Sequence, residues 1–160
     1  MSCFSSEILS EEITKCMEQL NGISLSSAKR LLEALEQESR RRQLNMVMSV
    51  CGPAGHMIAV HAMDDAFLVS FELSMKKAYT AVALKTTTMD LGQRIGPGQD
   101  SFGVDRMGDN KIVVVAGGVP LVSGGRIIGG LGVSGGTGEQ DHRLAEYGAG
   151  LVAAPDFFTR

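Results

Sequence analysis

Three histidines, His56, His61 and His142, are the side chains of this chain best suited to bind a transition metal. His56 follows a glycine turn and begins a predicted strand, where it either coordinates a metal or orients the turn. His142 lies beside Glu139 and Asp141 in the first turn of a predicted helix, and these acidic neighbours favour a protonated surface histidine. We expect His61 to be a neutral surface or interface histidine, so His56 is the candidate metal ligand.

Two acidic residues in a turn, Asp64 and Asp65, form a second candidate site together with Lys77 on the helix that follows. Such a set could bind a polar ligand or, weakly, a metal, although acidic residues are also common in turns for structural reasons. We include Met63, next to Asp64, among the ligand-binding candidates. Met107 lies in a glycine-bearing loop, where its polarizable thioether either contacts a flat apolar ligand or fills a gap between subunits.

The sequence indicates no catalytic constellation. Cys51 ends a predicted strand with no histidine partner near it in the sequence, and no serine elbow is present. The run SGGTGEQD could bind an anion at a helix start, but its own threonine and carboxylates already satisfy the free amides there. We therefore predict a non-catalytic protein, with an enzyme acting on a small hydroxyacid as the weaker alternative.

The composition indicates a soluble, single-domain protein and excludes several kinds of partner. The chain has 160 residues, 44% of them hydrophobic and 21% charged, which is ordinary for one globular domain. A net charge of -3 gives no electrostatic basis for binding nucleic acid or an anionic membrane. Three cysteines without close spacing, and neither a signal peptide nor a long apolar run, lead us to expect a cytoplasmic protein.

Helical periodicity dominates the first half of the chain. We expect residues 1–22 to be a helical extension, with a helix over Ser6–Leu20, and residues 23–160 to be a single domain. Ser24 should cap a second helix. A third is expected over Phe67–Lys85. Its predicted inward face consists of Phe71, Met75, Ala78 and Val82.

Strand signals and glycine turns dominate the rest of the chain. Ten of the 20 glycines fall between residues 117 and 138. We predict a hairpin of Val119–Ser123 with Arg126–Val133, turning at a Gly-Gly pair, then a helix with a capping box. Three more strands are predicted over Met46–Cys51, His56–Ala62 and Lys111–Ala116. The fold class is therefore α/β (α+β), with a single antiparallel sheet covered by helices.

Three stretches resemble a known family: VVAGGVPLVSGGRIIGGLGVSGGTGEQD, CGPAGHMIAVHAMDDA and KKAYTAVAL. They are similar to the haem-binding HbpS-like family, which includes GlcG proteins and the C-terminal domains of PduO-type corrinoid adenosyltransferases. The chain departs from the family pattern at Ala62, where relatives usually carry arginine, and it has no histidine in Ser24–Leu44. The resemblance implies a profilin-like fold, symmetric homo-oligomers and, in some members, haem or corrinoid roles.

We expect a homo-oligomer that binds a small molecule, haem or a corrinoid-related ligand, in a groove between subunits. His56 is then the candidate haem-iron ligand, and the loop Gly92–Asn110 is a wall of the groove. Association would also cover sheet edges that a monomer leaves exposed. The alternative, implied by the gene clusters of relatives, is a structural or chaperone-like accessory protein of a cobalamin-dependent glycerol or diol dehydratase system.

Overall fold

The computed structural model describes the chain except for residues 1–8, 10–11, 14–15, 18–20 and 160. The predicted helix over Ser6–Leu20 therefore lies mostly outside the described residues, and the boundary between residues 22 and 23 stays a prediction. In the part that is described, Leu9, Ile13 and Met17 are helical and exposed. No described helix is both long enough and apolar enough to cross a membrane.

The core of the fold is a four-stranded antiparallel sheet with the strand order β2-β1-β4-β3. The strands are β1 (Val47–Cys51), β2 (Met57–Ala62), β3 (Gly118–Ser123) and β4 (Arg126–Ser134). The β3–β4 hairpin turns at Gly124 and Gly125, which both have positive φ, at 56° and 75°. The predicted hairpin and the predicted single antiparallel sheet are confirmed.

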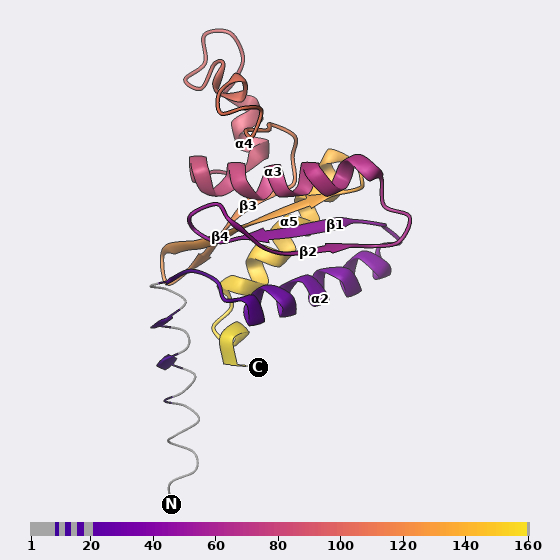
Figure 1. Ribbon diagram of the computed structural model, residues 1–160, viewed down its shortest axis with the longest axis vertical. Coiled ribbons are helices and arrows are strands. Elements are labelled where there is room, and N and C mark those ends of the chain that lie inside the picture. Colours follow the sequence, from indigo (N-terminus) through magenta and orange to yellow (C-terminus); the bar gives the residue numbers. More distant parts are fainter. Residues whose placement is uncertain (1–8, 10–11, 14–15, 18–20, 160) are drawn as a thin grey trace, which may run out of the picture.

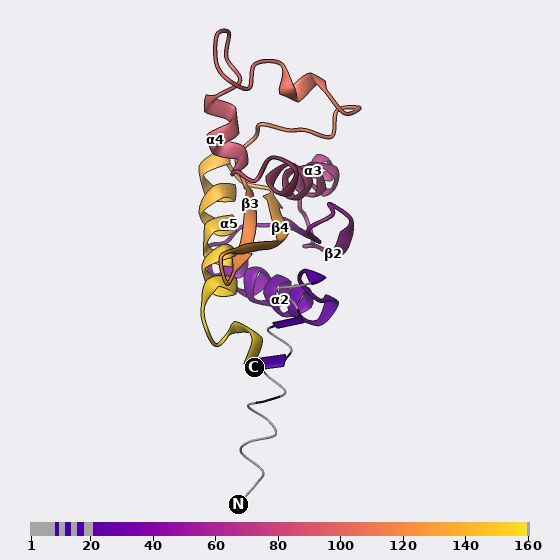
Figure 2. The same ribbon diagram turned by 90° about the vertical axis from the view of Figure 1, so that its left-hand side faces the viewer.

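Helices cover both faces of this sheet (Figure 1; Figure 2). Helices α2 (Leu25–Arg41) and α5 (Gly138–Ala153) pack on one face around Leu35, Leu131 and Leu144, while α3 (Leu68–Leu84) packs on the other. Ser24 caps α2, and Thr137 with Gln140 forms the predicted capping box of α5. Shorter helices follow at α4 (Thr88–Gln93), η1 (Val104–Arg106) and η2 (Phe157–Thr159).

Glycines in β4 bring α3 unusually close to the sheet. A Cβ atom at Gly132 would lie 1.8 Å from the Ser74 carbonyl oxygen, and one at Gly130 would lie 2.4 Å from that of Ala78. Neither position can accept a side chain unless the helix moves away. The density of glycine in this strand therefore reflects close packing between backbone and backbone.

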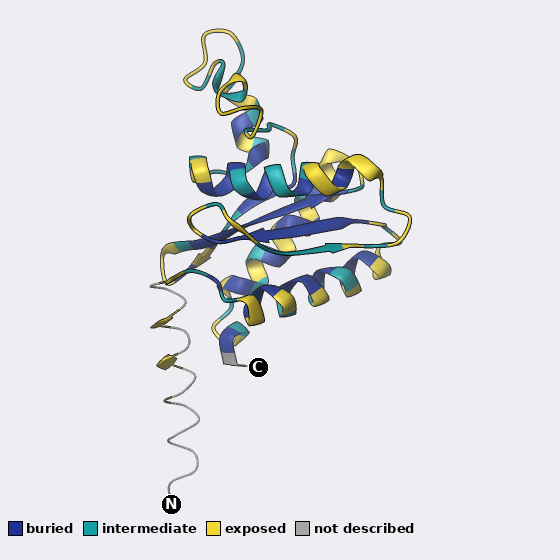
Figure 3. Cartoon of the chain, viewed as in Figure 1, coloured by how far each residue is buried: buried dark blue, intermediate teal, exposed yellow. Residues whose placement is uncertain are grey.

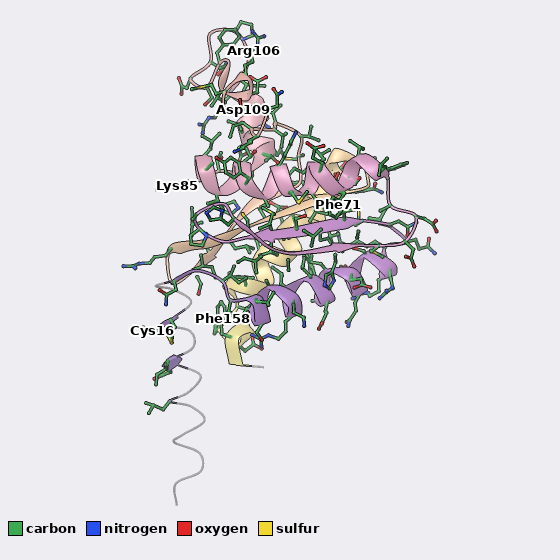
Figure 4. All side chains as sticks on the ribbon, in the orientation of Figure 1. Cys16, Phe71, Lys85, Arg106, Asp109 and Phe158 are labelled. Atoms are coloured by element: carbon green, nitrogen blue, oxygen red, sulfur yellow. The ribbon has the colours of Figure 1, made fainter. Side chains whose placement is uncertain are left out.

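The inward face predicted for α3 is partly wrong. Phe71 is exposed (Figure 4). Ser70, Ser74 and Lys77 are buried against the sheet, and Figure 3 shows buried and exposed parts alternating along α3. Because β4 offers glycine rather than side chains, the helix presents small residues to it and leaves its bulky residues outside. Hydrophobic periodicity therefore predicted the wrong orientation for Phe71, which faces away from the sheet.

The predicted strand Lys111–Ala116 is also wrong, since these residues belong to no strand. The backbone N–H of Val113 donates to Thr80 Oγ1 at 3.0 Å, so a side chain of α3 takes the place of a neighbouring strand. The segment returns from a long arm, residues 94–110, that extends away from the sheet beyond α4 (Figure 2). Arg106 and Asp109 lie on this arm (Figure 4).

Candidate ligand-binding groove

A groove of about 490 Å³ lies between the β1–β2 turn, the middle of α3 and the segment that returns from the arm. Its size falls within the range of small-molecule sites, roughly 300–1,000 Å³. The residues that line it are Ala54, Gly55, His56, Met57, Glu72, Met75, Lys76, Tyr79 and Lys111. Of the three histidines in the chain, His56 alone is part of this lining.

A β-bulge gives the groove its apolar strand wall. Val50 pairs with Ala59 but Cys51 pairs with Met57, so β2 carries one extra residue at this point. Met57 therefore shares the α3 side of the sheet with Cys51, whereas Ala59 and His61 point to the α2 side. Without the bulge, Met57 and His61 would lie on the same face of the sheet, because they are four residues apart on one strand.

The β1–β2 turn is held against α3 by a close contact. Gly55 has φ of +81°, and a Cβ atom there would lie 2.8 Å from the ring of Tyr79. A side chain at this position would therefore push the turn away from the helix and widen the groove. The turn thus brings His56 and Met57 into the same lining as Met75 of α3.

The helix side of the groove carries charge. The ammonium group of Lys76 lies 2.8 Å from a carboxylate oxygen of Glu72, one turn earlier on α3. The hydrogen bond from Lys76, and then its charge, lower the pKa of Glu72 below its usual value. An imidazole, two thioethers and an aromatic ring beside cationic groups suit a flat, largely apolar ligand with anionic substituents.

Met63 and Asp64 lie elsewhere, in a pocket of about 270 Å³ on the α2 side of the sheet. Glu36, Arg40 and Asp65 line this pocket as well. His61 is close by, with Nδ1 at 3.3 Å from Glu36. Met63 and Asp64 thus come together, but they are separated by the sheet from His56.

Lys77 points into the protein core. Its side chain has 0% exposure, and its ammonium group donates to Asp141 at 2.7 Å and to the Val133 carbonyl oxygen at 2.8 Å. The second carboxylate oxygen of Asp141 accepts the N–H of Gly136 at 2.8 Å. Burial lowers the pKa of Lys77 and raises that of Asp141, and the attraction between the two groups opposes both shifts. This pair joins α3, β4 and α5.

The remaining candidates are also apart from the groove. Met107 is exposed on the arm, and His142 has Nε2 at 3.3 Å from Glu146 on α5. Of the groove lining, only His56 was a candidate from the sequence; Met57, Lys76, Tyr79 and Lys111 were among the residues missed. The spacing of Glu72 and Lys76 was visible as a helix pair, but only the fold brings Lys111 beside them.

Comparisons with known proteins agree with this architecture. A family described as haem degrading protein HbpS-like matches residues 23–150. An uncharacterized 15.0 kDa protein from the dhaT-dhaS intergenic region of Citrobacter freundii is 37% identical over 81% of this chain and 91% of its own length. The corrinoid adenosyltransferase PduO of the same organism is 38% identical over 78% of this chain, which spans only 37% of PduO.

A solved structure described as a PduOC:heme complex has the same fold. It superposes with a TM-score of 0.76 and 36% sequence identity, over 81% of this chain and 94% of that one. The predicted fold and the predicted resemblance are both confirmed. The chain belongs to the HbpS-like family.

Proposed function

We propose that this chain binds haem in the groove described above, with His56 as the ligand of the iron. The observation that carries the proposal is the position of His56, the one histidine in a groove walled by Met57, Met75 and Tyr79. A relative at 36% identity has been solved as a heme complex, which supports this class of ligand. Haem, when bound, supplies an iron centre on a planar apolar surface with carboxylates at one edge. The proposal is one of binding, without catalysis.

A haem titration tests this proposal. Adding haem to the purified protein should produce a shifted and sharpened Soret band that saturates at one haem per chain. Replacing His56 with alanine removes an axial ligand, so the band should shift and the affinity should fall at least about tenfold, a change of about 1.4 kcal/mol. His61→Ala is the matched control, because His61 lies on the opposite face of the sheet. A spectrum of free haem, or equal spectra for both variants, would contradict the proposal.

We also propose that the chain forms homo-oligomers through the start of α3. Phe67, Leu68, Val69 and Phe71 are all exposed there, and they form an apolar surface of the kind that marks an interface. Light scattering after size-exclusion chromatography tests this. Leu68→Asp should reduce the mass to that of a monomer, whereas Leu25→Asp should not. Both leucines begin a helix and are exposed, at 94% and 57%. A monomeric wild-type protein would contradict this proposal.

A second candidate function is an accessory role beside a cobalamin-dependent glycerol or diol dehydratase. The observation that favours it is the similarity to part of a corrinoid adenosyltransferase. Under this function the protein should co-purify with the dehydratase and bind haem no better than an unrelated protein of similar charge. Haem binding that depends on His56 would favour the first proposal.

A further inference from the structure

We infer that Lys76 and Lys111 select a ligand that carries carboxylate groups, so the groove takes a tetrapyrrole with free propionates over a corrinoid with neutral amide side chains. This inference rests on the proposed function and names the feature of the ligand that the groove recognises. Both lysines belong to the lining, and each comes from a different element. The chemistry is that of an ammonium group binding a carboxylate.

The charge around the groove is opposite in sign to that of the whole chain. The chain has a net charge of -3, yet two lysines and one glutamate line the groove. The pocket that holds Asp64 has the reverse balance, with three carboxylates and Arg40. An anionic ligand is therefore attracted to the groove and repelled from the pocket on the other face of the sheet.

The backbone that carries Lys111 is fixed against the turn of α3 that carries Lys76. The Lys111 N–H donates to the Gly108 carbonyl oxygen at 3.1 Å, and the Val113 N–H donates to Thr80 Oγ1 at 3.0 Å. The same Thr80 hydroxyl donates to the carbonyl oxygen of Lys76 at 2.7 Å. One threonine thus connects both backbones, so the two lysines reach the groove from anchored positions.

Lys111 makes no ion pair with any residue that the structure describes, whereas Lys76 is paired with Glu72. A ligand carboxylate would therefore find Lys111 available and would compete with Glu72 for Lys76. The Glu72 carboxylate is 70% exposed, so giving up this contact costs little. Removing the Glu72 charge should therefore strengthen the binding of an anionic ligand.

Iron protoporphyrin and its dimethyl ester test the inference, because they share the macrocycle and differ in the two carboxylates. For the free acid, Lys76→Gln and Lys111→Gln should each weaken binding about threefold, as for a partly exposed ion pair, and the double variant about tenfold. Glu72→Gln should tighten it. For the diester, all of these variants should bind like the wild-type protein. Lys29→Gln, an exposed lysine on α2, is the matched control and should change neither affinity.

Salt and a corrinoid give two independent readouts. Affinity for the free acid should fall as salt is raised from 50 to about 500 mM, because salt screens charges near the surface, while affinity for the diester should not. Cobalamin in excess should fail to displace bound haem. Equal affinities for acid and diester, unchanged by either lysine substitution, would overturn the inference while leaving haem binding through His56 in place. If neither porphyrin binds, the proposed function and the inference both fail.

Discussion

Replacing Asp141 with alanine should destabilise the protein strongly, because it removes the carboxylate that neutralises Lys77 in the core. The Lys77 ammonium group would keep the Val133 carbonyl oxygen as its remaining acceptor among the described residues. It would stay fully buried, since its exposure is 0%. The N–H of Gly136 would also lose the carboxylate oxygen that it contacts at 2.8 Å. In Asp141→Ala, the Lys77 ammonium group and the Gly136 N–H therefore both lose the carboxylate that they contact.

The magnitude follows from these lost contacts. Breaking a buried ion pair on one side costs about 3–5 kcal/mol, and a lost amide hydrogen bond adds about 1 kcal/mol. We expect the free energy of unfolding to fall by about 4–6 kcal/mol in Asp141→Ala. Lys77→Met should cost less, about 2 kcal/mol, because Asp141 keeps the Gly136 N–H and can take up a proton. The double variant Lys77→Met/Asp141→Leu should lie within about 2 kcal/mol of the wild-type protein.

Guanidinium unfolding, followed by far-ultraviolet circular dichroism at one fixed protein concentration, measures these differences. The two single variants and the double variant form a cycle that isolates the interaction between Lys77 and Asp141. A loss below about 1 kcal/mol in Asp141→Ala would refute the structural role of the pair, since a buried unpaired charge cannot be that cheap. A double variant no more stable than Asp141→Ala would refute it too.

Two further predictions concern other parts of the core. Burial raises the pKa of Cys51 from 9.0 to about 11, so the folded thiol keeps its proton while the unfolded thiol loses it. The free energy of unfolding should therefore decline between pH 9 and 11, by up to about 2.7 kcal/mol. Unfolding measurements on Cys51→Ala should show a smaller decline over this pH range, because the variant has no thiol to titrate. An identical pH dependence in both proteins would contradict the burial of this thiol. Gly132→Ala should lower the melting temperature sharply, because its Cβ atom would clash with the Ser74 carbonyl oxygen. Gly150→Ala is the control on α5, where a Cβ atom meets open space, and it should raise the free energy of unfolding by up to about 1 kcal/mol. Similar melting temperatures for the two alanine variants would contradict the close helix–sheet contact.

Local chemistry made much of the fold predictable from the sequence. Gly124-Gly125 forms the β3–β4 turn, Ser24 caps α2, and Thr137 with Gln140 forms the capping box of α5. Each of these features depends on residues only a few positions apart. Features set by distant parts of the chain were not predictable. Phe71 was predicted to face inward from its helical spacing, but it is exposed. The spacing cannot show that β4 presents glycines to α3, which leaves no room for a large side chain between them.

The candidate site was predicted only in part for the same reason. His56 could be singled out because it follows a glycine turn, and the structure places it in the groove. Lys77 was predicted to join Asp64 and Asp65 because it lies on the helix that follows them, and nothing in the sequence connects it with Asp141, its partner in the core. Met57 faces the groove because of a bulge in β2, and Lys111 reaches it through a long arm, so neither position follows from local pattern.

A crystal structure of the protein grown with haem tests the central claim most directly. We predict that the iron is bound to the imidazole of His56, with the macrocycle between Met57 and α3 and the propionates at Lys76 and Lys111. Haem seated on the other face of the sheet, beside Met63 and Asp64, or held by His61 or His142, would contradict it.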